Sequence, residues 1–270
     1  MIKIAIGAVD AIAARTLEPF TSCSGLWLSS FEIASSLGIA DDDQLGIEDL
    51  SARVRAITRV STKPLFIDAS NSHRFGHTRL LELAASIDRR VTLVIDDTRY
   101  PRVNSFSKHA NSILNPSEMA TRLLPFLYEL RHFPLIEVCI RTEHYVVYHD
   151  LPATIKHLQE IIWRLQHRTD QILVHGYDII NNGIDPLHEG LPNQRFVTLA
   201  TLSPGAFIRD FIHTSISVLI IPSILTIQRF IAGQRLVDEI LRSEVTIDGP
   251  YKPFTYLIKD MQLGGGSEHI

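Results

Sequence analysis

Four polar side chains of complementary types stand at the ends of predicted strands. Asp68, Asp96 and Arg141 each close an apolar run, and His175 follows another. Hard divalent cations such as Mg²⁺ prefer carboxylate and water oxygens, so the two aspartates are candidate metal ligands. A guanidinium can fork onto a carboxylate or a phosphate. The set therefore suits chemistry on a small anionic substrate.

Each of these residues also has an ordinary structural interpretation. One aspartate at a strand end is more often a helix cap or a loop anchor, a lone histidine is more often structural, and Arg141 can simply pair with Glu143. All four at one end of a fold favour the functional interpretation. The cysteines lie apart from this set, because Cys139 is mid-strand and Cys23 precedes a strand.

The elements that must position these residues are eight apolar runs separated by segments with helical periodicity. Continuous hydrophobic runs are typical of parallel strands buried on both faces, and eight of them predict a closed (β/α)₈ TIM barrel. Catalytic residues of this fold come from the carboxyl ends of the strands. The predicted strands are 2–8, 25–30, 64–70, 91–97, 136–142, 172–176, 196–201 and 217–223.

Helix signals fill the intervals. Leu151 to Leu165 carries one apolar stripe, with Asp150 at its N-cap and Pro152 in its first turn. Asn115-Pro116 and Ser203-Pro204 open two further predicted helices, and residues 224 to about 242 form a long last one. We expect one barrel domain over residues 1–270, in which about 243–270 is a C-terminal extension with a flexible tail.

Composition narrows the class of protein. The formal charge is −4 and the pI is about 6.3, which does not suggest a nucleic-acid groove or a membrane-surface patch. Two cysteines are too few for a disulfide framework, and no apolar run is long enough to span a membrane. We expect a cytoplasmic protein whose partner is a small molecule.

The ordered motifs resemble those of the phosphoenolpyruvate mutase family, within the isocitrate lyase and phosphoenolpyruvate mutase superfamily. The similarity covers most of the chain, and the ordered set is more specific than any single piece. The matching segments are 95–105 for E-D-K-x₅-N-S, 25–31 for W-x-S-G-L/F, 37–41 for L-G-x-x-D, 140–143 for A-R-x-E, 174–176 for the histidine strand, and 7–11 for the opening loop.

The resemblance implies how a substrate would be held. Trp27 and Ser29, with the backbone of Ser30 and Phe31, would form the segment that binds the carboxylate and oxo groups of the substrate. Asp41 would lie near the transferred group. The resemblance also implies a Mg²⁺ site, in which Asp68 is the direct ligand and Asp96 holds the metal through water.

It further implies how a phosphoryl group would be handled. Arg141, His175, Asn104 and Ser105 would surround that group. The segment from Thr98 to about Leu114 would be a gating loop that closes over the substrate and excludes water. Arg102 would then bring a cation where the family has a lysine.

The departures from the family pattern concern the metal site and its surroundings. The third-strand motif D-x-D-T-G-Y-G-N has Ser70 in place of its second aspartate, and two residues are inserted before Phe75-Gly76. The signature glutamate is Asp96 and the signature lysine is Thr98. Ser30 stands where the family has a glycine. Fewer acidic ligands predict weak Mg²⁺ binding.

The leading hypothesis is an enzyme that interconverts phosphoenolpyruvate and 3-phosphonopyruvate. Asn104-Ser105 favours this mutase branch, and the absence of a K-K-C-G-H motif makes isocitrate or methylisocitrate cleavage a poor fit. One alternative is a hydrolase or carbon–carbon lyase of phosphonopyruvate, oxaloacetate or another 2-oxo acid. A second is a non-catalytic barrel that binds a metabolite or a partner subunit. The resemblance also implies a homo-oligomer, a dimer or a tetramer, that exchanges the last helix.

Overall fold

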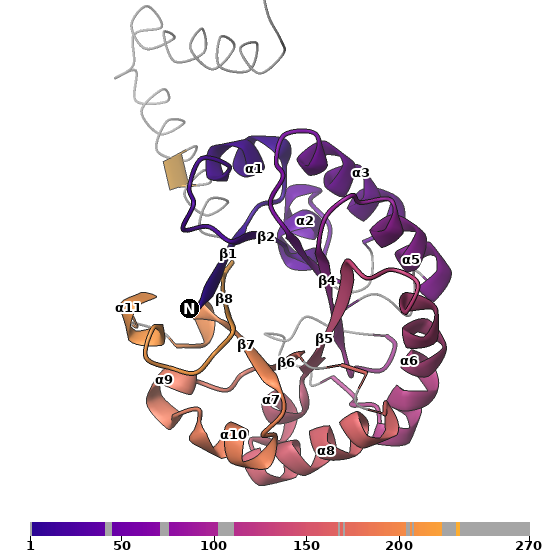
Figure 1. Cartoon of the computed structure of the whole chain (residues 1–270), viewed down its shortest axis with the longest axis vertical. Coiled ribbons are helices and arrows are strands. Elements are labelled where there is room, and N and C mark those ends of the chain that lie inside the picture. Colours follow the sequence, from indigo (N-terminus) through magenta and orange to yellow (C-terminus); the bar gives the residue numbers. More distant parts are fainter. Residues whose placement is uncertain are drawn as a thin grey trace, which may run out of the picture. The chain divides into compact units, whose positions relative to one another are not determined.

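Eight parallel strands close into a barrel in which each strand pairs with the next and β8 pairs with β1 (Figure 1). All eight predicted strands are present, and the predicted (β/α)₈ barrel is confirmed. The strands are β1 (Lys3–Gly7), β2 (Gly25–Leu28), β3 (Leu65–Asp68), β4 (Val91–Asp96), β5 (Ile136–Thr142), β6 (Gln171–Val174), β7 (Arg195–Leu199) and β8 (Val218–Ile221).

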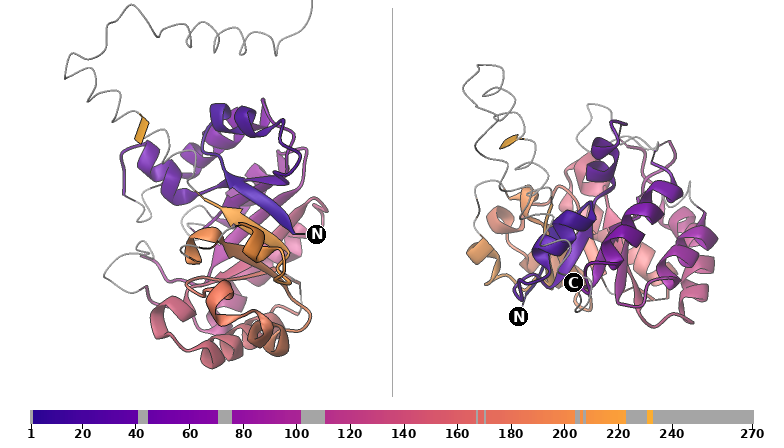
Figure 2. Two further views of the ribbon diagram at one scale, coloured as in Figure 1. Left: turned by 90° about the vertical axis from the view of Figure 1, so that its left-hand side faces the viewer. Right: turned by 90° about the horizontal axis from the view of Figure 1, so that it is seen from above.

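Helices lie outside the strands, as Figures 1 and 2 show. The computed structural model describes residues 2–40, 45–70, 76–101, 111–166, 168–169, 171–203, 206, 208–222 and 231–232. Its helices are α1 (Ala11–Leu17), α2 (Ser30–Ser36), α3 (Ile47–Thr58), α5 (His77–Ala85), α6 (Pro116–Leu130), α7 (His144–Tyr148), α8 (Leu151–Arg164), α9 (Ile179–Asn182), α10 (Asp185–Gly190), the 3₁₀ helix η1 (Ala200–Leu202) and α11 (Ile208–Phe211).

Alternate residues of each strand face two different apolar layers. One layer fills the barrel interior and includes Trp27, Phe66, Val94, Cys139 and Leu173, all buried. The other layer lies between the strands and the helices, and it takes the intervening strand residues together with the buried faces of the helices. Because successive side chains of a strand point to opposite sides, this alternation also decides which polar residues at the strand ends face inward.

The predicted helix starts at Asn115 and Asp150 are both confirmed. In α8 the Asp150 carboxylate accepts from the Ala153 N–H at 2.9 Å, and Pro152 stands in the first turn. In α6 the Asn115 side chain and Glu118 cap each other reciprocally, at 3.0 and 2.8 Å. Such caps satisfy backbone N–H groups that have no partner within the helix.

Residues up to Thr226 form one compact unit and those from Ile227 onward form a second. The start of the helix expected at Ser203-Pro204 lies partly outside the described residues. The next described helix, α11, begins at Ile208. Of the expected last helix, only Ile231 and Ala232 are described, and both are helical. The domain boundaries, the flexible tail, the exchanged helix and the oligomeric state stay predictions. In the parts of the chain that are described, no helix is long and apolar enough to cross a membrane.

Gly176, directly after His175, is required by both its conformation and its surroundings. Its φ is +79°, a region that L-residues with side chains rarely adopt. A Cβ at this position would stand 2.8 Å from Cγ2 of Val146 in α7. The close approach of the β6 end to α7 therefore depends on the missing side chain.

We predict that Gly176→Ala lowers the free energy of unfolding by about 2–4 kcal/mol, from the strained φ and the overpacking together. Gly183→Ala is the matched control, because Gly183 has a similar φ of +76° but no atom within 4 Å of an added Cβ. Urea unfolding of both variants separates the contact with Val146 from backbone strain. Equal losses in the two variants would contradict the packing argument.

Candidate active site

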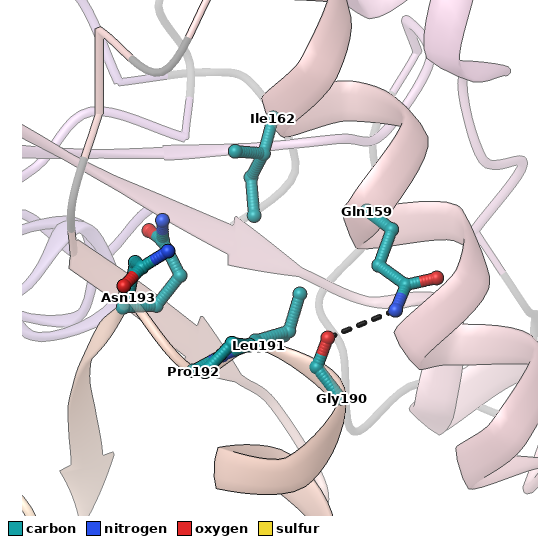
Figure 3. A pocket seen from close by; sticks show the side chains of 7 residues that line it. Gln159, Ile162, Gly190, Leu191, Pro192 and Asn193 are labelled. Atoms are coloured by element: carbon teal, nitrogen blue, oxygen red, sulfur yellow. Dashed lines mark hydrogen bonds between the residues drawn. The ribbon is translucent and has the colours of Figure 1, made fainter.

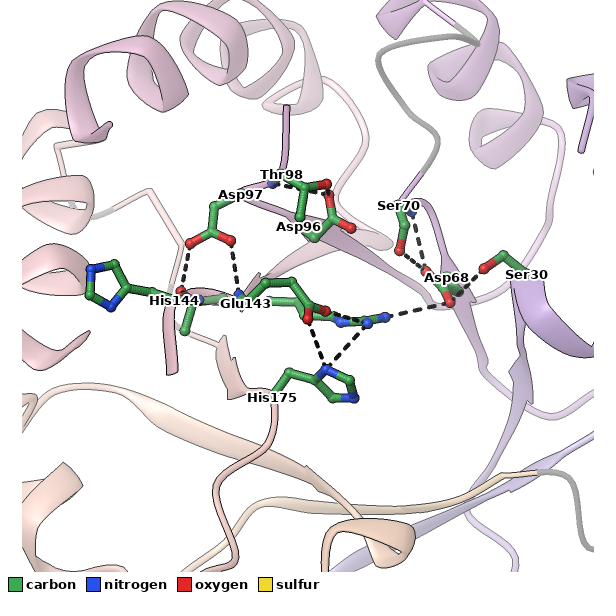
Figure 4. Close-up of polar contacts among 11 residues, drawn as sticks. Ser30, Asp68, Ser70, Asp96, Asp97, Thr98, Glu143, His144 and His175 are labelled. Atoms are coloured by element: carbon green, nitrogen blue, oxygen red, sulfur yellow. Dashed lines mark hydrogen bonds and ion pairs between the residues drawn. The ribbon is translucent and has the colours of Figure 1, made fainter. Parts of the chain in front are cut away.

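The inward-facing positions at the carboxyl ends of four neighbouring strands are polar. Asp68 continues the inward side of β3 from Phe66, and Asp96 that of β4 from Val94. Arg141 and His175 follow Cys139 and Leu173 in the same way on β5 and β6. The structure thus brings Arg141 together with Asp68, Asp96 and His175 at one end of the barrel interior. Figure 4 labels Asp68, Asp96 and His175 at this end.

Arg141 is at the centre of this cluster. Its guanidinium pairs with Glu143 and lies 3.7 Å from Oδ2 of Asp68, while its side chain is only 7% exposed. Burial acts to lower the pKa of Arg141, but the charges of Glu143, Asp68 and Asp96 hold that pKa above its usual value. Arg141 is therefore a permanent cation between carboxylates of two strands.

Glu143 joins Arg141 to His175. Its Oε2 lies 3.0 Å from Nδ1 of His175, and its side chain is fully buried. Burial acts to raise the pKa of Glu143, but Arg141 and His175 lower it well below the usual value, so Glu143 is ionised. Because Glu143 accepts a hydrogen bond, it favours the tautomer of His175 in which Nδ1 carries the proton. Nε2 is then the unprotonated ring nitrogen.

Hydroxyl groups surround the two aspartates. Oδ2 of Asp68 accepts from Oγ of Ser30 at 2.9 Å, and Oδ1 accepts from both the hydroxyl and the N–H of Ser70. Oδ1 of Asp96 accepts from Oγ1 of Thr98 at 2.9 Å and from the Thr98 N–H at 3.4 Å. All five residues are at most 5% exposed.

Asp97 has a different environment, because it points outward from β4. Its carboxylate accepts from Oγ1 of Thr142 at 2.5 Å and from the N–H of Glu143 at 2.9 Å. Nε2 of His157, on α8, lies 3.1 Å away. The ring of His157 packs against that of His144 in a tilted arrangement, with 4.7 Å between the centroids. Asp97 thus anchors the backbone at Glu143 while Asp96 faces the interior.

The two ends of the segment expected to gate the site are hydrogen-bonded to each other, and we call this pairing the base. Thr98 and Ile113 form an antiparallel bridge, and the N–H of Arg99 donates to Ser112 O at 2.8 Å. The N–H of Leu114 donates to Asp97 O at 2.7 Å. The predicted site residues Arg102, Asn104 and Ser105 lie outside the described residues, as does Asp41, and the gate stays a prediction.

The segment expected to bind the substrate carboxylate lies beside Asp68. Trp27 is buried in the barrel interior, and the Ser29 side chain accepts from the Glu32 N–H at 3.4 Å as the N-cap of α2. Phe31 is 49% exposed, so its side chain lies away from the interior. The polar group of this segment that reaches the cluster in the structure is the hydroxyl of Ser30.

Cavities elsewhere in the barrel unit offer less chemistry. One of about 190 Å³ lies between α8 and residues 190–194, where the Gln159 side chain donates to Gly190 O at 2.8 Å (Figure 3). Another of about 950 Å³ lies at the amino ends of the strands, opposite the cluster, where Glu137 already pairs with Arg90 and Arg195. Neither contains a residue of the predicted site.

The family model described as phosphoenolpyruvate phosphomutase matches residues 2–166 of this chain. The chain belongs to this family. The match spans β1 to α8 and includes Asp68, Asp96, Arg141 and Glu143, whereas His175 lies beyond it. A search among curated protein sequences finds no match.

Solved structures show the same fold at low sequence identity. Phosphoenolpyruvate phosphomutase from Streptomyces platensis subsp. rosaceus is 19% identical with a TM-score of 0.81, covering 98% of this chain and 93% of that one. A phosphonopyruvate hydrolase in complex with oxalate and Mg²⁺ is 18% identical with a TM-score of 0.76, covering 97% of this chain and 92% of that one. A 2,3-dimethylmalate lyase, described as a member of the phosphoenolpyruvate mutase/isocitrate lyase superfamily, is 15% identical with a TM-score of 0.77, covering 100% of this chain and 94% of that one. These neighbours are a mutase, a hydrolase and a lyase.

Asp97, His144 and His157 belong to the polar network beside the site, but they were not singled out from the sequence. Strand alternation alone would have turned Asp97 outward once Asp96 was placed inward. His157 follows Thr154 by three residues and precedes Ile161 by four, so it lies on the buried face of α8. Its contact with Asp97 spans 60 residues of sequence, and no local pattern contains it.

We predict that Thr142→Val lowers the free energy of unfolding by about 1–3 kcal/mol, because buried Asp97 loses a hydroxyl donor at nearly constant side-chain volume. The control is Thr121→Val on α6, whose exposed hydroxyl donates to Ser117 O and whose loss costs about 0.5 kcal/mol or less. Chemical denaturation measures both. A Thr142 variant as stable as the Thr121 variant would contradict the anchoring role of Asp97.

The pKa of His175 predicts a pH dependence of stability. Burial, and then the charge of Arg141, lower this pKa below its usual 6.5. The unfolded chain therefore binds a proton here that the folded protein does not, and stability falls as the pH drops through about 6.5. The lowered pKa of Glu143 extends the loss to pH values below its usual 4.5.

We expect His175→Asn to reduce the slope of unfolding free energy against pH between about pH 7.5 and pH 5 by up to one proton. His77 and His144, whose pKa values burial also lowers, retain part of the slope. The matched control is His132→Asn, which makes the same substitution at an exposed position. An unaltered slope in the His175 variant would show that this imidazole is not held neutral.

Proposed function

We propose that this protein is an enzyme that acts on phosphoenolpyruvate or a small 2-oxo acid at the carboxyl end of the barrel. The reaction we propose is the interconversion of phosphoenolpyruvate and 3-phosphonopyruvate. The observation that carries the proposal is the convergence of Asp68, Asp96, Arg141 and His175 on one end of the barrel interior. Membership of the family supports the reaction type.

The described residues suit an anionic substrate. Arg141 retains its positive charge because Glu143 and Asp68 raise its pKa, and it can attract a carboxylate or a phosphoryl group to this end of the barrel. Ser29 and the backbone after it would hold the pyruvyl half. His175, oriented through Nδ1 by Glu143, would exchange a proton or a hydrogen bond through Nε2.

The available oxygen donors fit a Mg²⁺ ion that is ligated partly by the substrate, rather than one whose ligands all come from the protein. Mg²⁺ commonly uses one or two carboxylates together with waters and substrate oxygens. Asp68 and Asp96 would hold it here, and within the described ranges no cluster of three or more His, Cys, Asp or Glu side chains is arranged for a metal. When bound, the ion supplies positive charge to the oxygens of the substrate.

In the proposed reaction the bond between phosphorus and the enol oxygen breaks and a bond between phosphorus and C3 forms, so no atom is gained or lost. Phosphoryl transfer passes through a loose state whose charge must be positioned and neutralised. Arg141 and Arg102 would supply cations, and Asn104, Ser105 and His175 hydrogen bonds. Asp41 would lie near the moving group. Closure of the segment from Thr98 to Leu114 would exclude water, which otherwise yields pyruvate and phosphate.

Two alternatives remain distinct from the mutase. A hydrolase or carbon–carbon lyase would use the same cluster on phosphonopyruvate, oxaloacetate or another 2-oxo acid. A non-catalytic barrel that binds a metabolite or a partner subunit is favoured by one observation. The side chains around Asp68 and Asp96 include the neutral hydroxyls of Ser70 and Thr98 at positions where the family pattern has charged residues.

Phosphorus NMR with phosphonopyruvate and Mg²⁺ tests the proposal. We expect a phosphate-ester signal to appear at the expense of the phosphonate signal. Inorganic phosphate would instead support the hydrolase. No change in phosphonopyruvate or phosphoenolpyruvate by phosphorus NMR, and none in oxaloacetate by proton NMR, would support the non-catalytic barrel.

Variants connect the activity to the site. Asp68→Asn preserves shape and removes a charge, and we expect at least about a hundredfold loss of kcat/KM, or about 3 kcal/mol of transition-state stabilisation. Asp88→Asn is the matched control, because this aspartate is 85% exposed and pairs only with its neighbour Arg89 among the described residues. Equal activity in both variants would contradict the assignment of the site.

A further inference from the structure

Three departures from the family pattern share one physical property. Ser30, Ser70 and Thr98 replace a glycine, an aspartate and a lysine of that pattern, and each contributes a hydroxyl. Each hydroxyl donates to a carboxylate of the proposed metal site. Ser30 and Ser70 donate to opposite oxygens of Asp68, and Thr98 donates to Asp96 (Figure 4). The three positions are far apart in sequence, so their convergence is a property of the folded site.

These bonds occupy most of the positions at which a cation would bind Asp68. A carboxylate has about four lone-pair directions. At Asp68 the donors are the Ser70 N–H, the Ser70 hydroxyl and the Ser30 hydroxyl, with Nη1 of Arg141 at 3.7 Å. A metal ion that ligates this carboxylate directly must displace at least one of them or compete with Arg141.

Displacement is costly because the donors are buried. Ser30 is 2% exposed, and Ser70 and Thr98 are fully buried. A buried hydroxyl that loses its acceptor pays a desolvation penalty of about 1–3 kcal/mol. At Asp96 the side chain and the N–H of Thr98 converge on the same oxygen, which fixes the carboxylate without a cation.

We propose that the hydroxyls of Ser30, Ser70 and Thr98 replace a resident cation in holding Asp68 and Asp96, so that the free protein has no high-affinity site for a divalent metal. A cation then binds well only when a substrate adds oxygen ligands of its own. This inference rests on the proposed function for the location of the metal site. It concerns the free protein, which can be tested without turnover.

A competing explanation gives the hydroxyl of Ser70 the opposite role. An O–H group can donate to Asp68 and still offer an oxygen lone pair to a metal. Under that explanation Ser70 is a ligand, and its removal weakens metal binding. Under the proposal Ser70 competes with the metal for Asp68, and its removal tightens binding. The sign of the change therefore distinguishes the two.

The test titrates the intact protein with Mn²⁺ alone, with free ion measured by electron paramagnetic resonance. We expect the wild type to bind Mn²⁺ with a Kd of about 1 mM or weaker, and Ser70→Ala to bind about fivefold tighter, the equivalent of one released hydrogen bond. Thr98→Val should act in the same direction through Asp96. It is nearly isosteric, so it keeps the test decisive if the Ser70 variant does not fold.

The matched control is Ser61→Ala, which removes a buried hydroxyl from the carboxylate of Glu18, a residue outside the barrel-end cluster. It should leave Mn²⁺ affinity unchanged. Micromolar Mn²⁺ binding by the wild type overturns the proposal. So does weaker or unchanged binding in both Ser70→Ala and Thr98→Val.

A second titration in the presence of oxalate separates this inference from the proposed function. We expect oxalate to tighten Mn²⁺ binding by at least tenfold in the wild type, since its oxygens complete the ligand set. If the hydroxyl variants tighten Mn²⁺ binding but no substrate turns over, the inference stands and the proposed reaction falls. Turnover together with tight metal binding by the wild type gives the reverse result.

Discussion

A guanidinium buried between carboxylates organises the functional end of this barrel. Arg141 is too deeply placed for water to compensate its charge, so it requires acidic partners, and Glu143 and Asp68 provide them. Glu143 in turn holds His175. The charge of Arg141 on β5 thus connects that strand to β3 through Asp68 and to the end of β6 through Glu143 and His175. Removal of either carboxylate would leave a buried cation with less compensation of its charge.

The backbone beneath Arg141 is held from outside the barrel as well as from inside. The N–H of Glu143 donates to Asp97, whose other partners are Thr142 and the α8 residue His157. The last residue of β4, Asp96, and the residue that follows it, Asp97, therefore have different roles. Asp96 faces the interior with Thr98 as its donor, and Asp97 faces the helices. This division places reactive groups on strands whose positions are fixed by a second, separate polar network.

The barrel was predictable because its strands are continuous apolar runs buried on both faces, and eight of them alternate with helical segments. The strand ends followed from the first polar residues, so Asp68, Asp96 and Arg141 could be placed at one end. Of their partners, Glu143 was anticipated beside Arg141, and the others could not be derived in this way. Ser70 is two residues from Asp68, but Ser30 is 38 residues away and His157 is 60 residues from Asp97. Such pairings depend on strand register and helix rotation, which leave no local pattern.

Thr98, Arg99, Ser112 and Ile113 form a hydrogen-bonded base that brings the two ends of the intervening sequence together. The pairing at this base is made by backbone groups. Loop-closure entropy also rises slowly with length, by about 0.6 kcal/mol for each doubling. A change in the length of the sequence between the two ends of the base therefore costs the barrel little stability, while the buried charges on the strands keep their places.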